Sequence, residues 1–237
     1  MSIVQINGGH IPIDSQVAEW IAIHDPDFVF VVQGSDSLLR SELLLEKYPF
    51  RSGHPHHDIF SKTRLWDPVV LFGEAHFRNE YIAEFLKVAE IEGQRVLLGG
   101  PSVPSSRNHS LWYRAQQTLC DVADSINSIR NVSTMPVITA GDFNSTPFGA
   151  GYQNFKRRSG LVDSNPRLFR VGTWPANAPN YARVGIDHVF ISREISLVKH
   201  SVGPNLGGDH RPLLVELKLP AQINGGHAGL NMGEAKW

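Results

Sequence analysis

The segment Pro136-Val-Ile-Thr-Ala-Gly-Asp-Phe-Asn-Ser-Thr-Pro147 is an apolar run that ends at a glycine and continues into polar side chains. Its first half has the short, β-branched composition of a buried strand. Asp142 and Asn144 follow Gly141 and are two residues apart, so in extended chain they share one face and can address the same ligand oxygen. An Asx turn ahead of a helix explains this spacing equally well.

The chain after this segment has the pattern of a helix. Ser145 or Thr146 can cap a helix that starts with Pro147 and stops at Gly160. The last turn of this helix would hold three basic residues, which favour a helix C-terminus. These are Lys156, Arg157 and Arg158.

Short apolar stretches recur along the chain, with helical patterns between them, which predicts a mixed α/β domain. We expect strands at 3–6, 28–32, 69–72, 96–98, 137–140, 189–191 and 213–219, and helices at 15–24 and 109–129. Residues 81–91 fit a helical stripe, yet Glu92-Gly93 also fits a tight turn between two strands. Periodicity leaves both alternatives open.

The composition indicates a single globular domain. The chain has 237 residues and a formal net charge of -1, so it lacks the net field that holds a polyanion nonspecifically. No stretch of about 18 apolar residues occurs, so we expect no membrane insertion, and we expect a cytoplasmic monomer. Residues 1–220 would form the domain, and the Gly-rich residues 221–237 would form a mobile tail.

Two further polar clusters interrupt apolar strands. Asp187 and His188 lie within Arg183-Val-Gly-Ile-Asp-His-Val-Phe-Ile-Ser192, and Asp209 and His210 precede the strand that starts near Leu213. A charge inside a strand needs a partner. Each acid–histidine pair alone is more often structural than catalytic, but three polar clusters in this order favour an active site.

The ordered set GDFNSTP (141–147), GIDHVFIS (185–192) and GGDHRPLLVEL (207–217) resembles the endonuclease/exonuclease/phosphatase superfamily, with its deoxyribonuclease I-like fold. The resemblance covers residues 136–219, and a weaker match extends upstream to Val4. It implies a four-layer α/β/β/α sandwich. It also implies hydrolysis of phosphate esters with a divalent cation, Mg²⁺ or Mn²⁺, at the edge where the two sheets meet.

The resemblance also assigns roles to the catalytic side. Asp142 would orient and deprotonate the attacking water, and Asn144 would hold a nonbridging phosphate oxygen. Asp187 would hydrogen-bond His210 and favour the imidazolium, which stabilises the charge that builds on the phosphorus centre.

On the metal side, the resemblance implies Asp209 and Asn7, with Gln33 as a weaker ligand. For substrate contact, Trp174 could stack on a base or sugar, and Arg114 is a phosphate candidate. Half-buried loop packing is the commoner reason for such a tryptophan. The expected partner is a phosphodiester substrate, and nucleic acid is one class of such substrates.

The chain departs from the family pattern in two places. The family has a metal-binding Glu where this chain has Gln33, and an amide ligates a hard cation more weakly because it brings no charge. The family also has a histidine within the segment that is 99–104 here, and this chain has none there. The alternative to an enzyme is therefore a catalytically impaired module that binds a phosphorylated ligand or a protein.

The run Gly53-His-Pro-His-His-Asp58 contains several metal-ligating residue types and could compensate for these losses. An exposed polar loop is the simpler explanation, since no flanking element holds its geometry.

Overall fold

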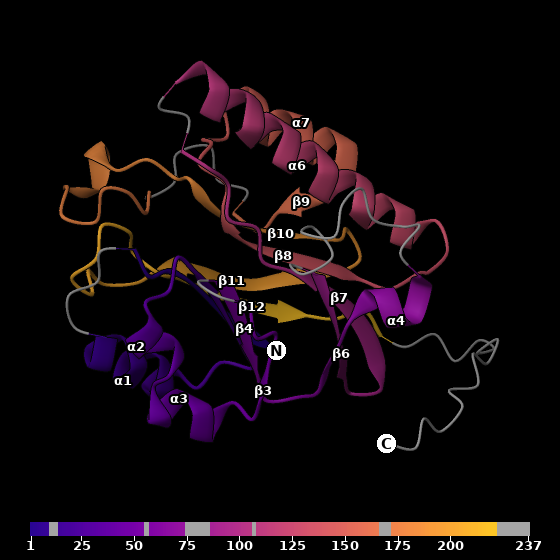
Figure 1. Cartoon of the computed structure of the whole chain (residues 1–237), viewed down its shortest axis with the longest axis horizontal. Coiled ribbons are helices and arrows are strands. Elements are labelled where there is room, and N and C mark those ends of the chain that lie inside the picture. The colour runs from indigo at the N-terminus through magenta and orange to yellow at the C-terminus, as the bar shows by residue number, and fades with distance from the viewer. Residues whose placement is uncertain (10–13, 55–56, 74–85, 106–107, 166–171, 222–237) are drawn as a thin grey trace.

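The computed structural model of the chain describes residues 1–9, 14–54, 57–73, 86–105, 108–165 and 172–221 (Figure 1). Two sheets stack face to face in the middle of the molecule, and helices cover their outer faces (Figure 1). The arrangement is the expected four-layer α/β/β/α sandwich, so the predicted fold class is confirmed.

The first sheet joins both ends of the described chain. Its strands run in the order β11-β12-β1-β2-β4-β3. The strand β1 is parallel to β2 and antiparallel to β12, so the N-terminal strand is central in the sheet. The bounds are β1 (Ser2–Asn7), β2 (Phe28–Val32), β3 (Phe50–Arg51), β4 (His57–Ser61), β11 (Ser196–Val202) and β12 (Leu213–Lys218).

The second sheet has the order β5-β6-β7-β8-β10-β9. The strand β8 is parallel to β7 and antiparallel to β10. Each sheet therefore has one parallel pair near its centre, flanked by antiparallel strands. The bounds are β5 (Leu65–Trp66), β6 (Leu86–Ile91), β7 (Gln94–Gly99), β8 (Val137–Asp142), β9 (Val162–Asp163) and β10 (Asp187–Ile191).

Helices form the two outer layers. The first sheet is covered by α1 (Asp14–His24), α2 (Asp36–Leu39) and α3 (Glu42–Lys47), and the second by α4 (Pro68–Phe72), α6 (His109–Arg130) and α7 (Ala150–Ser159) (Figure 1). A short 3₁₀ turn, η2 (Asn180–Ala182), lies in the loop before β10.

The core has three apolar layers, and the strand period of two assigns side chains to them. Phe28 and Phe30 of β2 enter the layer between the sheets, whereas Val29 and Val31 pack against the helices. Since both faces of such a strand are buried, its sequence is continuously apolar, which is why 28–32 and 137–140 were predictable as strands.

One predicted strand is wrong. Residues 69–72 belong to the helix α4, which begins after Asp67 with Pro68 in its first turn. An aspartate followed by proline is a helix-start signal, and a short apolar run alone does not distinguish a buried strand from a buried helix.

The undecided segment forms a hairpin where the structure describes it. β6 and β7 pair antiparallel through a turn at Glu92 and Gly93, whose φ angles are 51° and 79°. The strand alternative is therefore correct for 86–91, and residues 81–85 lie outside the described residues.

The helix expected from Pro147 starts later than predicted. α7 begins at Ala150 with Gly149 as its N-cap and ends at Gly160, which has φ 68°. Ser145 does not cap the helix as its N-cap residue; its Oγ accepts a hydrogen bond from the Tyr152 backbone N–H at 3.1 Å.

Among the described helices, none combines the length and the apolar character that a membrane crossing requires. The tail predicted at 221–237 lies outside the described residues from 222 onward.

Candidate active site

The site forms where β8 and β10 run side by side. The register places Asp142, the last residue of β8, directly opposite Asp187, the first residue of β10. Both side chains are buried, at 1% and 4% exposure. Two carboxylates directly opposite each other repel, so this pairing needs compensating donors or cations.

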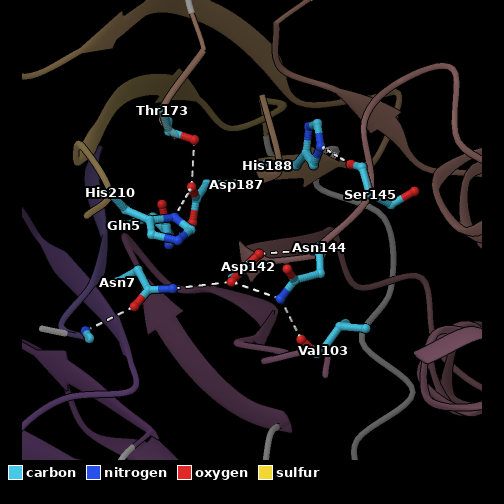
Figure 2. Close-up of polar contacts among 11 residues, drawn as sticks. Gln5, Asn7, Val103, Asp142, Asn144, Ser145, Thr173, Asp187, His188 and His210 are labelled. Atoms are coloured by element: carbon cyan, nitrogen blue, oxygen red, sulfur yellow. Dashed lines mark hydrogen bonds and ion pairs between the residues drawn. The ribbon is translucent and has the colours of Figure 1, made fainter. Parts of the chain in front are cut away.

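Asp187 receives those donors from three different segments (Figure 2). Its Oδ2 accepts hydrogen bonds from His210 Nδ1 at 2.7 Å and from Thr173 Oγ1 at 2.5 Å. Its Oδ1 accepts from Gln5 Nε2 at 3.1 Å. The contact with His210 holds Nδ1 as the donor, which leaves Nε2 as the ring nitrogen directed away from Asp187.

Asp142 is held by two asparagines, one from each sheet region (Figure 2). Asn7 Nδ2, at the end of β1, donates to Asp142 Oδ2 at 3.1 Å, and Asn144 Nδ2 donates to the same oxygen at 3.0 Å. The Asn144 backbone N–H donates to Oδ1 at 2.8 Å. Asn144 has φ 44°, a left-handed conformation that asparagine tolerates and that folds its amide back onto Asp142.

The Asn144 amide has a second partner. Its Nδ2 also donates to the Val103 carbonyl at 2.7 Å, so both amide hydrogens are engaged within the protein. To hold a phosphate oxygen, as the sequence predicts, Asn144 has to exchange one of these bonds for the substrate.

The pKa values of the central groups reflect this crowding. Burial raises the pKa of the Asp142 carboxyl to about 8, the charge of Asp187 adds to the rise, and the charge of His210 opposes it. Burial lowers the pKa of His210, but the hydrogen bond and charge of Asp187 and the charges of Asp142 and Asp209 outweigh it and raise the pKa to about 9. The imidazole is therefore a cation at neutral pH.

Asp142, Asp187 and His210 also form a cluster with metal-ligating atoms. One candidate ligand atom from each lies within 4.8 Å of the others, and all three residues are buried. Nearby, the Asp209 Oδ1 atom is buried and has no hydrogen-bond partner within the described ranges. An oxygen in that state is ready to accept a cation or a water.

Asn7 and Gln33 lie close to each other. A β-carbon built on Gly9 would be 3.1 Å from Asn7 Oδ1 and 2.8 Å from Gln33 Oε1, so the two amide oxygens border the same small space. Gln33 is exposed and has φ 53°. The two predicted amide ligands of the metal side are thus neighbours, and Asn7 connects them to Asp142.

A sequence profile of the Endonuclease/Exonuclease/phosphatase family matches residues 6–210, which include every residue described above except Gln5. The chain belongs to this family. Its members are hydrolases of phosphoester bonds. A search of curated protein sequences finds no match.

Solved structures of family members share the fold at low identity. A structure from Beutenbergia cavernae described as an endonuclease/exonuclease/phosphatase aligns with a TM-score of 0.66 and 16% identity over 93% of this chain and 72% of that chain. A mannosyl-6-phosphatase of Bacteroides thetaiotaomicron aligns with a TM-score of 0.63 and 14% identity over 92% and 100%. A 3′ phosphatase from Neisseria bound to a product DNA hairpin aligns at 0.66 and 16% over 92% and 99%.

The other histidine of the family motif lies on the opposite face of β10. His188 is 1% exposed, and its ring contacts Asp163 Oδ2 at 3.0 Å and the Ser145 carbonyl at 2.9 Å. It therefore fastens the loop after β8 to the second sheet, and it does not face Asp142 and Asp187.

The predicted substrate residues are exposed. Trp174 is 41% exposed and follows Thr173, while Arg114 lies on the exposed side of α6. The possible metal role of the histidine-rich run loses one ligand, because Asp58 accepts from Arg51 and from Ser52 Oγ and is 2% exposed. Residues 55–56 of that run lie outside the described residues.

Sequence reasoning missed Gln5 and Thr173. Gln5 is fully buried in an apolar strand, and a period of two places it on the same face as Asn7, which was a usable signal. Thr173 had no such signal, because its contact with Asp187 depends on how the preceding loop folds back.

Proposed function

We propose that this family member is a Mg²⁺-dependent phosphodiesterase of the nuclease type. The observation that carries the proposal is the buried cluster of Asp142, Asp187 and His210, with candidate ligand atoms within 4.8 Å of one another at the edge of two stacked sheets. Two carboxylates that face each other favour the binding of a metal cation, and the imidazolium beside them can stabilise the negative charge of a phosphate ester during hydrolysis.

The side chains present fit a magnesium ion. Asp209, Asn7 and Gln33 supply oxygen atoms, which are the ligands that Mg²⁺ prefers. The buried, unpartnered Asp209 Oδ1 supports this assignment, and so does the mutual repulsion of Asp142 and Asp187, which a cation relieves. When bound, Mg²⁺ supplies charge that stabilises the phosphate oxygens and favours attack by water.

The residues of the chain itself have separate proposed roles in the reaction. Asp142 orients the attacking water and takes its proton in its ionised form, which the charge of His210 favours and which is a stronger base than a free aspartate because burial raises its pKa. His210, held by Asp187, directs its cationic ring toward the phosphate and stabilises the charge that develops there. Thr173 and Gln5 keep Asp187 in place.

The substrate we propose is a phosphodiester, with nucleic acid as the leading class. One structural neighbour is described as a mannosyl-6-phosphatase, and another is described as a 3′ phosphatase bound to a product DNA hairpin. Trp174 can stack on a base or sugar and Arg114 can contact a phosphate, since both are exposed.

The test is metal-dependent turnover. Purified protein is assayed on bis-p-nitrophenyl phosphate and on plasmid DNA with Mg²⁺ or Mn²⁺, with EDTA, and as the His210→Ala variant. We expect activity that EDTA abolishes and that His210→Ala lowers by about a hundredfold or more, the scale of one charge-stabilising contact. The matched control is His24→Ala, which removes an exposed histidine of α1 and should keep full activity.

A folded protein that turns over neither substrate with either metal contradicts the proposal. Equal activity of His210→Ala and the wild type would show that another group does the chemistry.

A further inference from the structure

Arg183 is a buried arginine that lacks a carboxylate partner. It is 7% exposed, and its Nε and Nη1 atoms are shielded from solvent with no hydrogen-bond partner in the part of the chain that the structure describes. Only Nη2 is satisfied, by the side-chain oxygen of Asn180. A guanidinium removed from water without an anion is costly, so this arrangement needs a reason.

A second arginine, Arg211, lies close by, and its positive charge further disfavours the charged form of Arg183. Burial lowers the pKa of the Arg183 guanidinium, and the charge of Arg211 lowers it further. Arg211 Nε donates to the Ala176 carbonyl at 2.9 Å, which is a neutral acceptor. Among the described residues, the side-chain hydrogen bonds of these two arginines go to the neutral oxygens of Asn180 and Ala176, an arrangement that favours binding of an anion.

The backbone holds both arginines against one segment. The Arg211 N–H donates to the Thr173 carbonyl at 3.0 Å, and the Val184 N–H donates to the Trp174 carbonyl at 2.7 Å. Arg211 and Arg183 thus flank the segment 173–176 from two sides.

This segment also forms part of the candidate active site. Thr173 holds Asp187, and Arg211 directly follows His210 in the chain. The segment 173–176 therefore connects the backbone at Arg183 and Arg211 to the residues proposed to act on the scissile phosphate, Asp187 and His210.

The cover over Arg183 is thin. The Arg183 side chain contacts the turn η2 (Asn180–Ala182) through Asn180, and the residues of this turn are all exposed, with Tyr181 at 91%. The Asn180 amide oxygen is an uncharged acceptor for Nη2, so an anion that arrives from solvent can replace it and also reach Nε or Nη1.

We propose that Arg183 and Arg211 form a subsite for a second phosphate group of the substrate, next to the phosphate that is hydrolysed. The inference rests on the proposed function and narrows it, since it selects substrates that carry at least two phosphate groups, as a nucleic-acid strand does. A guanidinium fork matches phosphate oxygens in geometry and charge, whereas a neutral sugar or a single ester gives these arginines nothing to bind.

The first test uses matched substrates. One is the p-nitrophenyl ester of thymidine 5′-phosphate, and its partner carries an added 3′-phosphate; a second pair has the ester on the 3′ side and the added phosphate on the 5′ side. We expect kcat/KM to be about tenfold higher for the doubly phosphorylated member of at least one pair, the gain of a charge-assisted contact.

The variant Arg183→Met keeps an unbranched side chain similar in length to the aliphatic part of arginine and removes the charged guanidinium. In it, the tenfold preference should fall to about one. Arg193→Met, which removes an exposed arginine at the turn after β10, should keep the preference. In phosphate-free buffer, Arg183→Met should also melt about 2–4 °C higher than the wild type, because it relieves an uncompensated charge.

A binding measurement separates this inference from the proposed function. Titration calorimetry in EDTA compares thymidine 3′,5′-bisphosphate, thymidine 5′-phosphate and inorganic phosphate, on wild type and on Arg183→Met. Tighter binding of the bisphosphate that requires Arg183 supports the subsite even if no ester is turned over.

Three results would overturn the subsite. One is hydrolysis of both members of each pair at equal kcat/KM. Another is a preference for the second phosphate that persists in Arg183→Met. The third is inorganic phosphate binding as tightly as the bisphosphate, which would indicate a site for a free anion.

Discussion

Thr173 contacts the carboxylate that orients His210, and it does so through a single hydroxyl. The change Thr173→Val keeps the shape of the side chain and removes the donor to Asp187. Because a hydrogen bond to a charged group contributes about 1.5–3 kcal/mol, we expect kcat to fall about tenfold with KM nearly unchanged. Steady-state kinetics on bis-p-nitrophenyl phosphate measures this, and Thr173→Ser should restore most of the rate.

Thr118→Val is the matched control for that prediction. Thr118 is partly exposed on α6, and its hydroxyl donates to the Arg114 carbonyl and not to Asp187. If both valine variants lose activity equally, Thr173 has a general structural role and no specific link to Asp187.

Tyr48 carries a polar atom that the fold does not use. The residue is fully buried, and its hydroxyl has no hydrogen-bond partner among the described residues. We expect Tyr48→Phe to raise the free energy of unfolding by about 1 kcal/mol at pH 7, since it removes an unsatisfied group. Urea denaturation measures the change, and Tyr181→Phe, at a position that is 91% exposed, should have no effect.

The same residue makes stability depend on pH. Burial, with the charges of Asp25 and Asp27, raises the pKa of Tyr48 above its usual range. The neutral form is thus favoured in the folded state, so stability is intact below the unfolded pKa of about 10 and falls as pH rises above it. The advantage of Tyr48→Phe should therefore grow between pH 9 and pH 11. A constant difference across this range would contradict the assignment.

At the scale of elements, β8 depends on Gly141 to let a loop approach it. A β-carbon at Gly141 would lie 2.0 Å from the Pro101 carbonyl oxygen. The loop that would be pushed away also supplies the Val103 carbonyl that holds Asn144. We expect Gly141→Ala to destabilise the protein by about 3 kcal/mol, as an overpacked core does, and to lower activity.

Gly100, which lies in the loop that approaches β8, provides the control position. A β-carbon on Gly100 would lie 3.5 Å or more from its neighbours, which is ordinary contact distance. Gly100→Ala should therefore change the urea midpoint little. If the two alanine variants behave alike, the close approach at Gly141 is not what limits this strand.

Elements that are buried on both faces were predictable, and short ones with mixed signals were not. The strand at 137–140 and the helix at 109–129 follow directly from apolar runs and helical spacing. Residues 69–72 have the same apolar composition but form a helix, since Asp67 and Pro68 start one. The outcome there depends on five residues, too few for periodicity to decide.

The candidate site shows the same limit. The motif residues Asp142, Asp187 and His210 were visible in sequence because charges interrupt apolar strands. Arg183 was not, because an arginine in a loop is expected to be exposed, and only the folded chain shows it to be buried without an acid.

At the scale of the whole molecule, the metal side joins the two sheets. Asn7 ends β1 of the first sheet and Asp209 precedes β12, whereas Asp142 and Asp187 belong to the second sheet. A cation bound among them, as we propose, would hold the sheets together and relieve the repulsion between the carboxylates. At a hundred times its Kd, Mg²⁺ should stabilise the fold by about 2.7 kcal/mol, which raises Tm by about 5–10 °C over EDTA.

The measurement is thermal denaturation in MgCl₂, with NaCl of equal ionic strength as the salt control. Gln33→Glu restores a charged ligand and should reach the same Tm at a lower Mg²⁺ concentration, unlike Gln153→Glu on the exposed side of α7. A Tm that Mg²⁺ leaves unchanged would place the metal, if any, elsewhere.

The pairing of β1 with β12 has a consequence for the order of events during translation. Residues 2–5 leave the ribosome about 200 residues before residues 213–216, with which they pair. His210 reaches Asp187 only when the segment just before β12 has docked. Until then the nascent chain keeps one side of β1 open and the active site incomplete, so folding must wait for contacts of very high sequence separation. A ribosome that stalls before residue 210 therefore holds a chain without the histidine, and the contact between His210 and Asp187 forms only after β12 has been synthesised.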